Sequence, residues 1–142
     1  MSGNIKLRWF LLAPILVALF VVASPVVSWA GKLEDAQEQV RQNPDDVDAH
    51  GNLGVAYGNS GQYQEAIASL KEAIRIKPDY AEAHGNLGLA YHKLGQYQEA
   101  IASYKEAIRI NPNYAKAHYN LGYAYGGLGQ YQEAIASYKE AI

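Results

Sequence analysis

Three histidines recur at intervals of 34 residues, at His50, His84 and His118. Imidazole is a common metal ligand and general base, so a regular row of imidazoles invites comparison with a series of metal sites. A protein zinc site gathers about three or four ligands around one ion, and no carboxylate or second histidine accompanies any of the three at ligand spacing. We therefore expect these histidines to serve the packing of the fold.

The sequence offers no other candidate for catalysis. It contains no cysteine, which excludes a disulfide framework, a thiolate metal site and a thiol nucleophile. HExxH, GxSxG and strand-led glycine motifs are missing, and the glycine-rich run 126–129 is typical of a turn between helices rather than of a phosphate-binding loop. The sequence predicts a protein that is not an enzyme and that has no catalytic residues, metal site or cofactor.

A second row of polar side chains has the same spacing, at Asn52, Asn86 and Asn120. A side-chain amide offers both a donor and an acceptor, which match the N–H and C=O groups of an extended peptide. The row therefore favours a site for peptide backbone. The alternative is that these amides cap or bridge neighbouring helices.

The common spacing arises from a repeat that covers most of the chain. Segments that begin at Val47, Ala81 and Ala115 align without gaps, and the first two are identical at about three quarters of their positions. Each segment carries an apolar stripe at helical spacing, a Gly-Gln-Tyr turn and a second, amphipathic stripe. Because a single helical hairpin cannot bury its apolar face alone, neighbouring hairpins must stack.

This spacing resembles the tetratricopeptide repeat family. The family's Leu-Gly pair, tyrosine, second-helix alanine and closing proline fall on Leu53-Gly54, Leu87-Gly88 and Leu121-Gly122, on Tyr57, Tyr91 and Tyr125, on Ala66, Ala100 and Ala134, and on Pro78 and Pro112. The chain departs from the family pattern in two ways. Histidine replaces the early tryptophan, and the later aromatic residue is Leu70 in the first copy but Tyr104 and Tyr138 in the others.

The resemblance implies an all-α, right-handed superhelical solenoid of tandem antiparallel helix hairpins, with an inner groove. The predicted repeats are 47–80, 81–114 and 115–142, the last without its closing proline. A polar helix over Leu33 to Asn43, within a half-repeat at 31–46, is expected to cap the amino end. At the other end, the apolar residues Ile135, Tyr138 and Ile142 have no following repeat to cover them, so we expect self-association or further residues to do so.

The differences between the repeats gather in the first helices, while the second helices are almost unchanged. The resemblance implies that the first helices form the inner wall, with the asparagine row on it. The sequence therefore predicts that a protein or peptide partner binds this wall, through the asparagines and through five residues that select its sequence: Val55, Leu89, Tyr123, Lys93 and Lys116. A clamp for acidic chain ends, known in some relatives, is not expected, because Gly51 and Asn120 stand where basic residues are needed.

Residues 1–30 differ in character from the rest. Lys6 and Arg8 precede an uncharged apolar stretch, and Ser28-Trp29-Ala30 resembles a small-x-small cleavage site before Gly31. The segment is either a cleaved signal peptide or a membrane anchor retained over residues 9–30. In both cases the repeats are expected on the far side of the membrane, periplasmic or extracellular.

The net charge of −2 and the lack of a Lys/Arg cluster argue against nucleic acid as a partner, since its binding depends on neutralising phosphates. The predicted function is an exported, non-catalytic scaffold for another polypeptide. Two alternatives remain open. The repeats could be the targeting portion of a longer enzyme, such as a repeat-bearing glycosyltransferase, or a structural part that assembles with itself.

Overall fold

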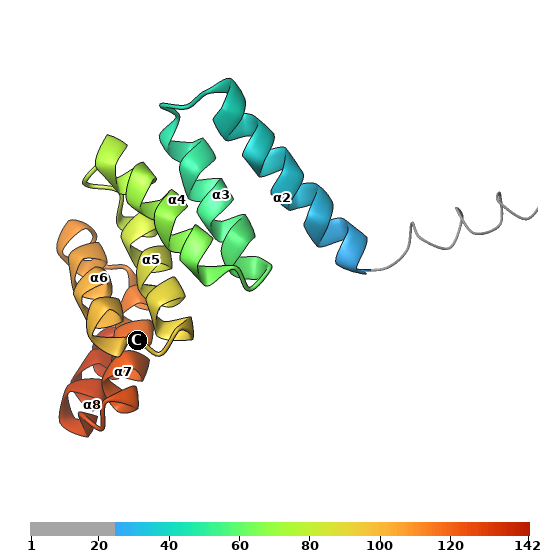
Figure 1. The fold of residues 1–142 in the computed structure, drawn as a ribbon. Coiled ribbons are helices and arrows are strands. Elements are labelled where there is room, and N and C mark those ends of the chain that lie inside the picture. Colours follow the sequence, from blue (N-terminus) through green and yellow to red (C-terminus); the bar gives the residue numbers. More distant parts are fainter. Residues whose placement is uncertain (1–24) are drawn as a thin grey trace, which may run out of the picture.

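The computed structural model describes the backbone of residues 25–142 and the side chains from Ala30 onward. This part of the chain is all-helical (Figure 1). Its helices are α2 (Pro25–Gln42), α3 (Val47–Asn59), α4 (Tyr63–Ile76), α5 (Ala81–Lys93), α6 (Tyr97–Ile110), α7 (Ala115–Gly127) and α8 (Tyr131–Glu140).

The helices pair in chain order into the hairpins α3–α4, α5–α6 and α7–α8, and the second helices α4 and α6 also pack against the first helix of the next hairpin. Helix α2 packs on α3 at the amino end of the stack, and α7 and α8 form the opposite end (Figure 1). The predicted all-α solenoid of antiparallel hairpins is confirmed.

The turns follow from local chemistry. The carboxylate of Asp46 caps α3 by accepting hydrogen bonds from the backbone N–H groups of Asp48 and Ala49, at 2.9 and 3.2 Å. Inside each hairpin, the turn passes through a glycine with φ between 73° and 79°, at Gly61, Gly95 and Gly129. Side chains other than glycine rarely adopt this left-handed conformation, so the glycine fixes the place of the turn.

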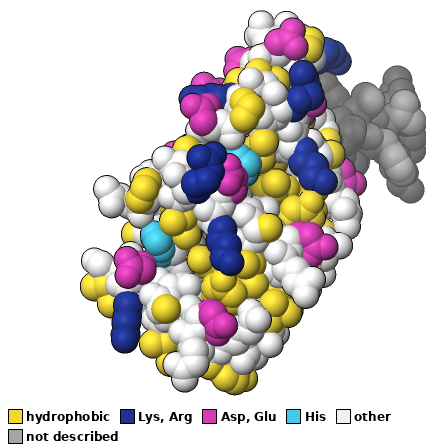
Figure 2. Space-filling view, turned by 90° about the vertical axis from the view of Figure 1, so that its left-hand side faces the viewer, with side chains coloured by type: hydrophobic (Ala, Val, Ile, Leu, Met, Phe, Trp, Pro, Cys, Tyr) yellow, Lys and Arg dark blue, Asp and Glu magenta, His cyan; other side chains and the backbone are white. Residues whose placement is uncertain are grey.

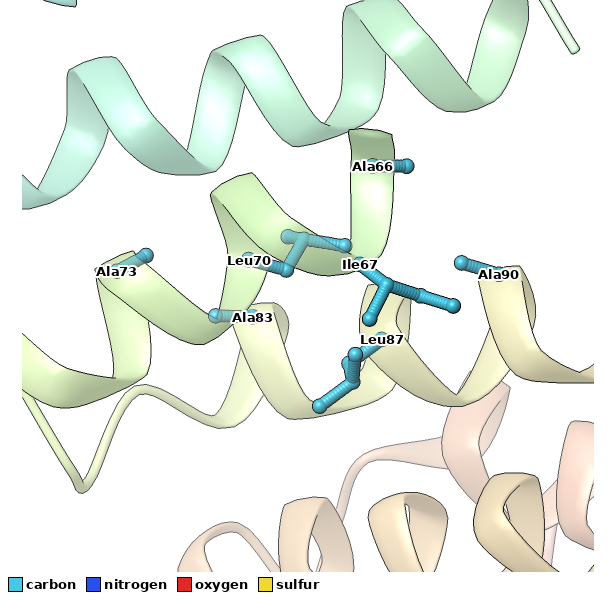
Figure 3. Packing of buried hydrophobic residues seen from close by; sticks show 7 residues of the cluster. All are labelled: Ala66, Ile67, Leu70, Ala73, Ala83, Leu87 and Ala90. Carbon is cyan, nitrogen blue, oxygen red and sulfur yellow. The ribbon is translucent and has the colours of Figure 1, made fainter. Parts of the chain in front are cut away.

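The core lies between each second helix and the two first helices beside it. Ala66, Ile67, Leu70 and Ala73 of α4 pack against Ala83, Leu87 and Ala90 of α5 (Figure 3). Glycine in the first helices permits this approach: a Cβ on Gly54 would lie 2.5 Å from Cγ of Leu70, and one on Gly88 would lie 2.7 Å from the ring of Tyr104. The recurring Leu-Gly pair is thus a packing signal.

The three spaced histidines join each first helix to the loop before it. Nε2 of His50 lies 2.8 Å from the carbonyl oxygen of Pro44. The equivalent distances from His84 to Pro78 and from His118 to Pro112 are both 2.9 Å. The carbonyl accepts, so Nε2 carries the proton in each ring. This contact agrees with the structural role expected from the sequence and replaces packing of the family's tryptophan with a hydrogen bond.

Helix α2 is longer than the sequence suggested. It was expected to begin near Leu33, but it begins at Pro25 and continues through Ala30 and Gly31, across the predicted boundary between leader and repeats. Proline at the first helical position is favourable because its missing N–H would have no partner there. The predicted signal peptide or anchor lies mostly outside the described residues. Among residues 25–142, no helix combines the length and apolar character that a membrane crossing requires.

Candidate functional site

A chain of adjoining hollows runs along the first helices. One, of about 270 Å³, lies between α2 and α3 and is lined by Asn52 and Val55. The next, of about 210 Å³, lies between the first two hairpins, and a third, of about 260 Å³, lies between the last two. Val55 lines the first and second hollows and Leu89 the second and third, so neighbouring hollows adjoin each other. We call them together the groove.

All eight residues that the sequence singled out line the groove. Asn52 and Val55 line its first hollow; Val55, Asn86, Leu89, Lys93 and Lys116 line the second; Leu89, Lys93, Asn120 and Tyr123 line the third. The geometry therefore brings the predicted residues onto one surface, although it does not by itself test what they bind.

The asparagine row has no structural partner in the described part of the chain. Asn52 is exposed and Asn86 and Asn120 are half-buried, and none of their amides hydrogen-bonds to another residue within 25–142. The amides neither cap a helix nor bridge hairpins here, which removes the main support for the structural alternative. Their donors and acceptors are free to meet a ligand.

Two ammonium groups flank the middle hollow. Lys93 of α5 and Lys116 of α7 both line it and are exposed. Within residues 25–142 the ion pairs are Arg41–Glu38, Arg75–Glu72 and Arg109–Glu106, each inside a single helix. Neither lysine therefore has a carboxylate partner in this part of the chain, and the hollow between them favours an anionic group.

The end of the groove near α7 is aromatic. The rings of Tyr119 and Tyr123 are 56% and 57% exposed. The imidazole of His92 lies with its centroid 4.9 Å from the ring of Tyr123 and 5.2 Å from that of Tyr97. Its Nε2 is buried and has no hydrogen-bond partner among the described residues. Burial, and secondarily the charge of Lys93, lower the pKa of His92 below its usual value.

Neither His92 nor Tyr119 was among the residues that the sequence predicted for the groove. The signal for Tyr119 was present, because it occupies the position of Gly51 and Gly85 in the other repeats. Those glycines accommodate the rings of Tyr80 and Tyr114 from the end of the same repeat. The change from glycine to tyrosine at a groove position was the available clue.

The second helices present a different surface. Figure 2 shows the face that carries α4 and α6, on which Lys and Arg alternate with Asp and Glu around small apolar areas. A hydrogen bond from Arg75 lowers the pKa of Glu72, and Arg109 does the same to Glu106. These pairs are fully satisfied within their own helix, so this face has the character of a solvated surface.

Three family models match the chain. A model described as TPR repeat matches residues 59–95 and 88–129, and two described as tetratricopeptide repeat match 40–68 and 119–142. The chain belongs to the tetratricopeptide repeat family. The resemblance drawn from the Leu-Gly, tyrosine, alanine and proline positions is therefore confirmed. Tetratricopeptide repeats are generally interaction scaffolds rather than enzymes.

Solved structures of the same fold include MamA. A crystal structure of MamA is 33% identical over 77% of this chain, with a TM-score of 0.72, and a MamA RS-1 ArsTM double mutant is 27% identical over 81%, with a TM-score of 0.74. The chain spans 64% and 65% of the length of these two proteins. No protein with a curated description matches the sequence.

A second kind of neighbour was solved with a ligand. The second repeat domain of Spaghetti (RPAP3), bound to the HSP90 peptide SRMEEVD, is 26% identical over 72% of this chain and 95% of that domain, with a TM-score of 0.67. A tetratricopeptide domain of this size is thus able to hold a short peptide.

Proposed function

We propose that this tetratricopeptide protein is a binding scaffold that captures an extended segment of another protein along the groove. The observation that carries the proposal is the asparagine row: three amides that have no hydrogen-bond partner among the described residues, repeated at one position of α3, α5 and α7. Because the hairpins stack regularly, the amides line one path. A peptide along that path exposes backbone donors and acceptors at regular intervals.

The asparagines supply affinity that is independent of peptide sequence. Each amide is able to donate to a carbonyl oxygen and accept from an N–H of the bound backbone. A hydrogen bond of this kind contributes about 0.5–1.5 kcal/mol. The neighbour RPAP3, solved with a bound HSP90 peptide, supports peptide binding by a protein of this fold.

Specificity comes from the positions that differ between repeats. Val55, Leu89 and Tyr123 occupy equivalent places on α3, α5 and α7, and Lys93 and Lys116 flank the middle hollow. Each repeat therefore presents a different side chain to the peptide. Changing Tyr123 or Lys116 should reorder the preference among peptides, whereas changing an asparagine should weaken all of them.

The test begins with a pull-down that uses the exported chain as bait and continues with a calorimetric titration of the recovered partner peptide. The test variant replaces Asn52, Asn86 and Asn120 with Ala. Its matched control replaces three exposed amides of the second helices, at the same 34-residue spacing, with Ala: Gln64, Gln98 and Gln132.

We expect each asparagine replacement to weaken binding by about 2- to 13-fold, since each removes about 0.5–1.5 kcal/mol. The glutamine variant should bind like the original protein. Unchanged affinity of the asparagine variant, with helicity intact by circular dichroism, would place the binding surface elsewhere. Loss of helicity in the single variants would indicate that the asparagines stabilise the fold rather than bind a peptide.

We further propose that the scaffold works outside the cytoplasm, on the basis of Lys6, Arg8 and the apolar run that follows them. A reporter fused after Ile142 should be active only across the membrane. Mass spectrometry should find a mature chain that begins at Gly31 if the leader is cleaved, or an intact Met1 in the membrane fraction if it is an anchor. Reporter activity in the cytoplasm would contradict both.

Self-association is a second candidate function, favoured by the last hairpin. Ile135 of α8 is 49% exposed, while its equivalent Ile67 in α4 is 6% exposed. Tyr131 and Ile142 are exposed as well, although Tyr138 packs over Gly122. Sedimentation of residues 25–142 at increasing concentration should show association, and a monomer at high concentration would exclude this candidate.

A further inference from the structure

The middle hollow of the groove opens at a repeat position where the first two hairpins differ. Gly58 of α3 lines this hollow, and no heavy atom lies within 4 Å of the place where its Cβ would sit. The equivalent residue of the second hairpin is His92. Glycine in the last turns of a helix costs stability relative to other residues, so its presence here leaves a space at the expense of helix propensity.

The hollow is deep and its floor is apolar. It reaches Gly54, Ala66, Leu70 and Ala90, which belong to the core between α3, α4 and α5. Its volume is about 210 Å³. An apolar cavity of roughly 150 Å³ is large enough to hold a benzene molecule, so an aromatic side chain fits.

The hollow between the second and third hairpins, of about 260 Å³, is built differently, because His92 lines it where the middle hollow has Gly58. The ring of His92 contacts Tyr97 and Tyr123, which are the equivalents of Tyr63 and Leu89 in the lining of the middle hollow. Tyr104 fills the position of the smaller Leu70. The hollow at this second junction does not reach Ala100 or Ala124, the equivalents of the floor residues Ala66 and Ala90.

The charge around the middle hollow indicates which group should lie next to the aromatic side chain. The residues that line the middle hollow include Lys93 and Lys116 and no acidic residue. Neither lysine has an ion-pair partner within the described chain. A carboxylate beside the mouth would be attracted by both, and a cation there would be repelled.

We propose that the middle hollow is an anchor pocket that takes one aromatic side chain of the bound peptide, with a carboxylate next to that side chain held between Lys93 and Lys116. The inference rests on the proposed function, since it assigns a position in the same groove. It names the class of partner: a segment in which an acidic residue adjoins an aromatic one.

The experiment uses short peptides capped at both ends, with a central Asp-Phe in a Gly-Ser background and 4-fluorophenylalanine as the aromatic residue. Binding to the full chain is followed by fluorine NMR. Comparison peptides replace Phe with Ala (followed by its proton signals), replace Asp with Lys, or carry a free carboxylate at the chain end. The protein variants are Gly58→His, which copies the second repeat, and Gly126→His, which makes the same change at the equivalent position of α7, outside the hollows of the groove.

We expect the Asp-Phe peptide to bind, and both Gly58→His and the loss of the ring to weaken binding about tenfold or more, since burial of one ring is lost. The Asp-to-Lys peptide should lose roughly two- to fivefold, as expected for exposed charges. Gly126→His and the free chain end should change little.

The inference is overturned if Asp-Phe does not bind the original chain, if Gly58→His and Gly126→His bind it equally well, or if binding requires the free chain end. The asparagine variant separates this failure from failure of the proposed function. If peptide binding depends on the asparagines but not on Gly58, the proposal of peptide binding along the groove stands and the proposal of an anchor pocket is wrong.

Discussion

The first and second helices of the hairpins differ in how much their sequences vary from repeat to repeat. In α4, α6 and α8 the repeats share nearly every residue, on the buried side and on the charged outer side alike. In α3, α5 and α7 the buried Leu-Gly pair and the asparagine row are constant, while the other groove positions change between repeats. The contrast separates two demands on the first helices: one side packs, and the other faces a hollow.

This difference has a physical origin. Helices α4 and α6 each pack against two first helices, so most of their apolar positions are enclosed, as Ala73 and Ala107 are. A first helix has a side that faces only the groove, where side chains such as Val55 and Tyr123 remain exposed. Variation on that side costs little folding free energy, and so it is available for recognition.

The largest expected effect contrasts two tyrosines. Tyr104 of α6 is 1% exposed, so Tyr104→Ala should lower the free energy of unfolding by about 3–5 kcal/mol, as for other large aromatic truncations in cores. Tyr123→Ala, on the groove side of α7, should change it by about 0.5 kcal/mol or less. Urea unfolding followed by circular dichroism measures both. Equal losses would contradict the division between packing and groove sides.

The next effect contrasts two glycines of first helices. Gly88→Ala should destabilise the fold by about 1–3 kcal/mol, because its Cβ would lie 2.7 Å from the ring of Tyr104. Gly58→Ala should be neutral or stabilise by up to about 1 kcal/mol, because its Cβ meets open space and alanine favours helix. Thermal unfolding of the two variants measures both changes in stability. A clear loss of stability in Gly58→Ala would show that the hollow is not open.

Residue type alone did not distinguish the glycine that permits close packing from the glycine that opens the hollow, but much else could be predicted from the sequence. The fold could be predicted from the second helices, the closing prolines and the Leu-Gly pairs, since each encodes a local conformation or a close contact. The positions of the asparagine row and of Lys93 and Lys116 followed from the repeat register. The hollow at Gly58 and the contacts of His92 did not, because they depend on how side chains of adjacent hairpins meet. The early start of α2 at Pro25 was missed because its apolar residues were assigned to the leader.

A smaller effect concerns the spaced histidines. His84→Ala removes the hydrogen bond to the carbonyl of Pro78 and should cost about 0.5–1.5 kcal/mol of stability. His84→Gln, which keeps a donor, should lose less. If the alanine and glutamine variants unfold at the same urea concentration as the original protein, the contact contributes nothing to the fold.

The smallest effect is the pH dependence contributed by His92. Its pKa is lowered in the folded state by burial and by Lys93, so the unfolded chain binds the proton more readily. Protonation therefore favours unfolding, and stability falls as pH drops from about 7 toward 5. His92→Gln should reduce that fall, with Tyr97 and Tyr123 still beside the replaced side chain. An identical pH profile for variant and original would show that His92 is not linked to folding.

The central claim, that the first helices bind and the second helices support them, is tested most directly by mapping the ligand on the protein. Backbone amide signals of the full chain are recorded by NMR while the recovered partner peptide is added. The account predicts the largest shifts along the groove, at Asn52, Asn86 and Asn120 and their neighbours on α3, α5 and α7. Shifts concentrated on the outer residues of α4 and α6, with the asparagines unmoved, would contradict it.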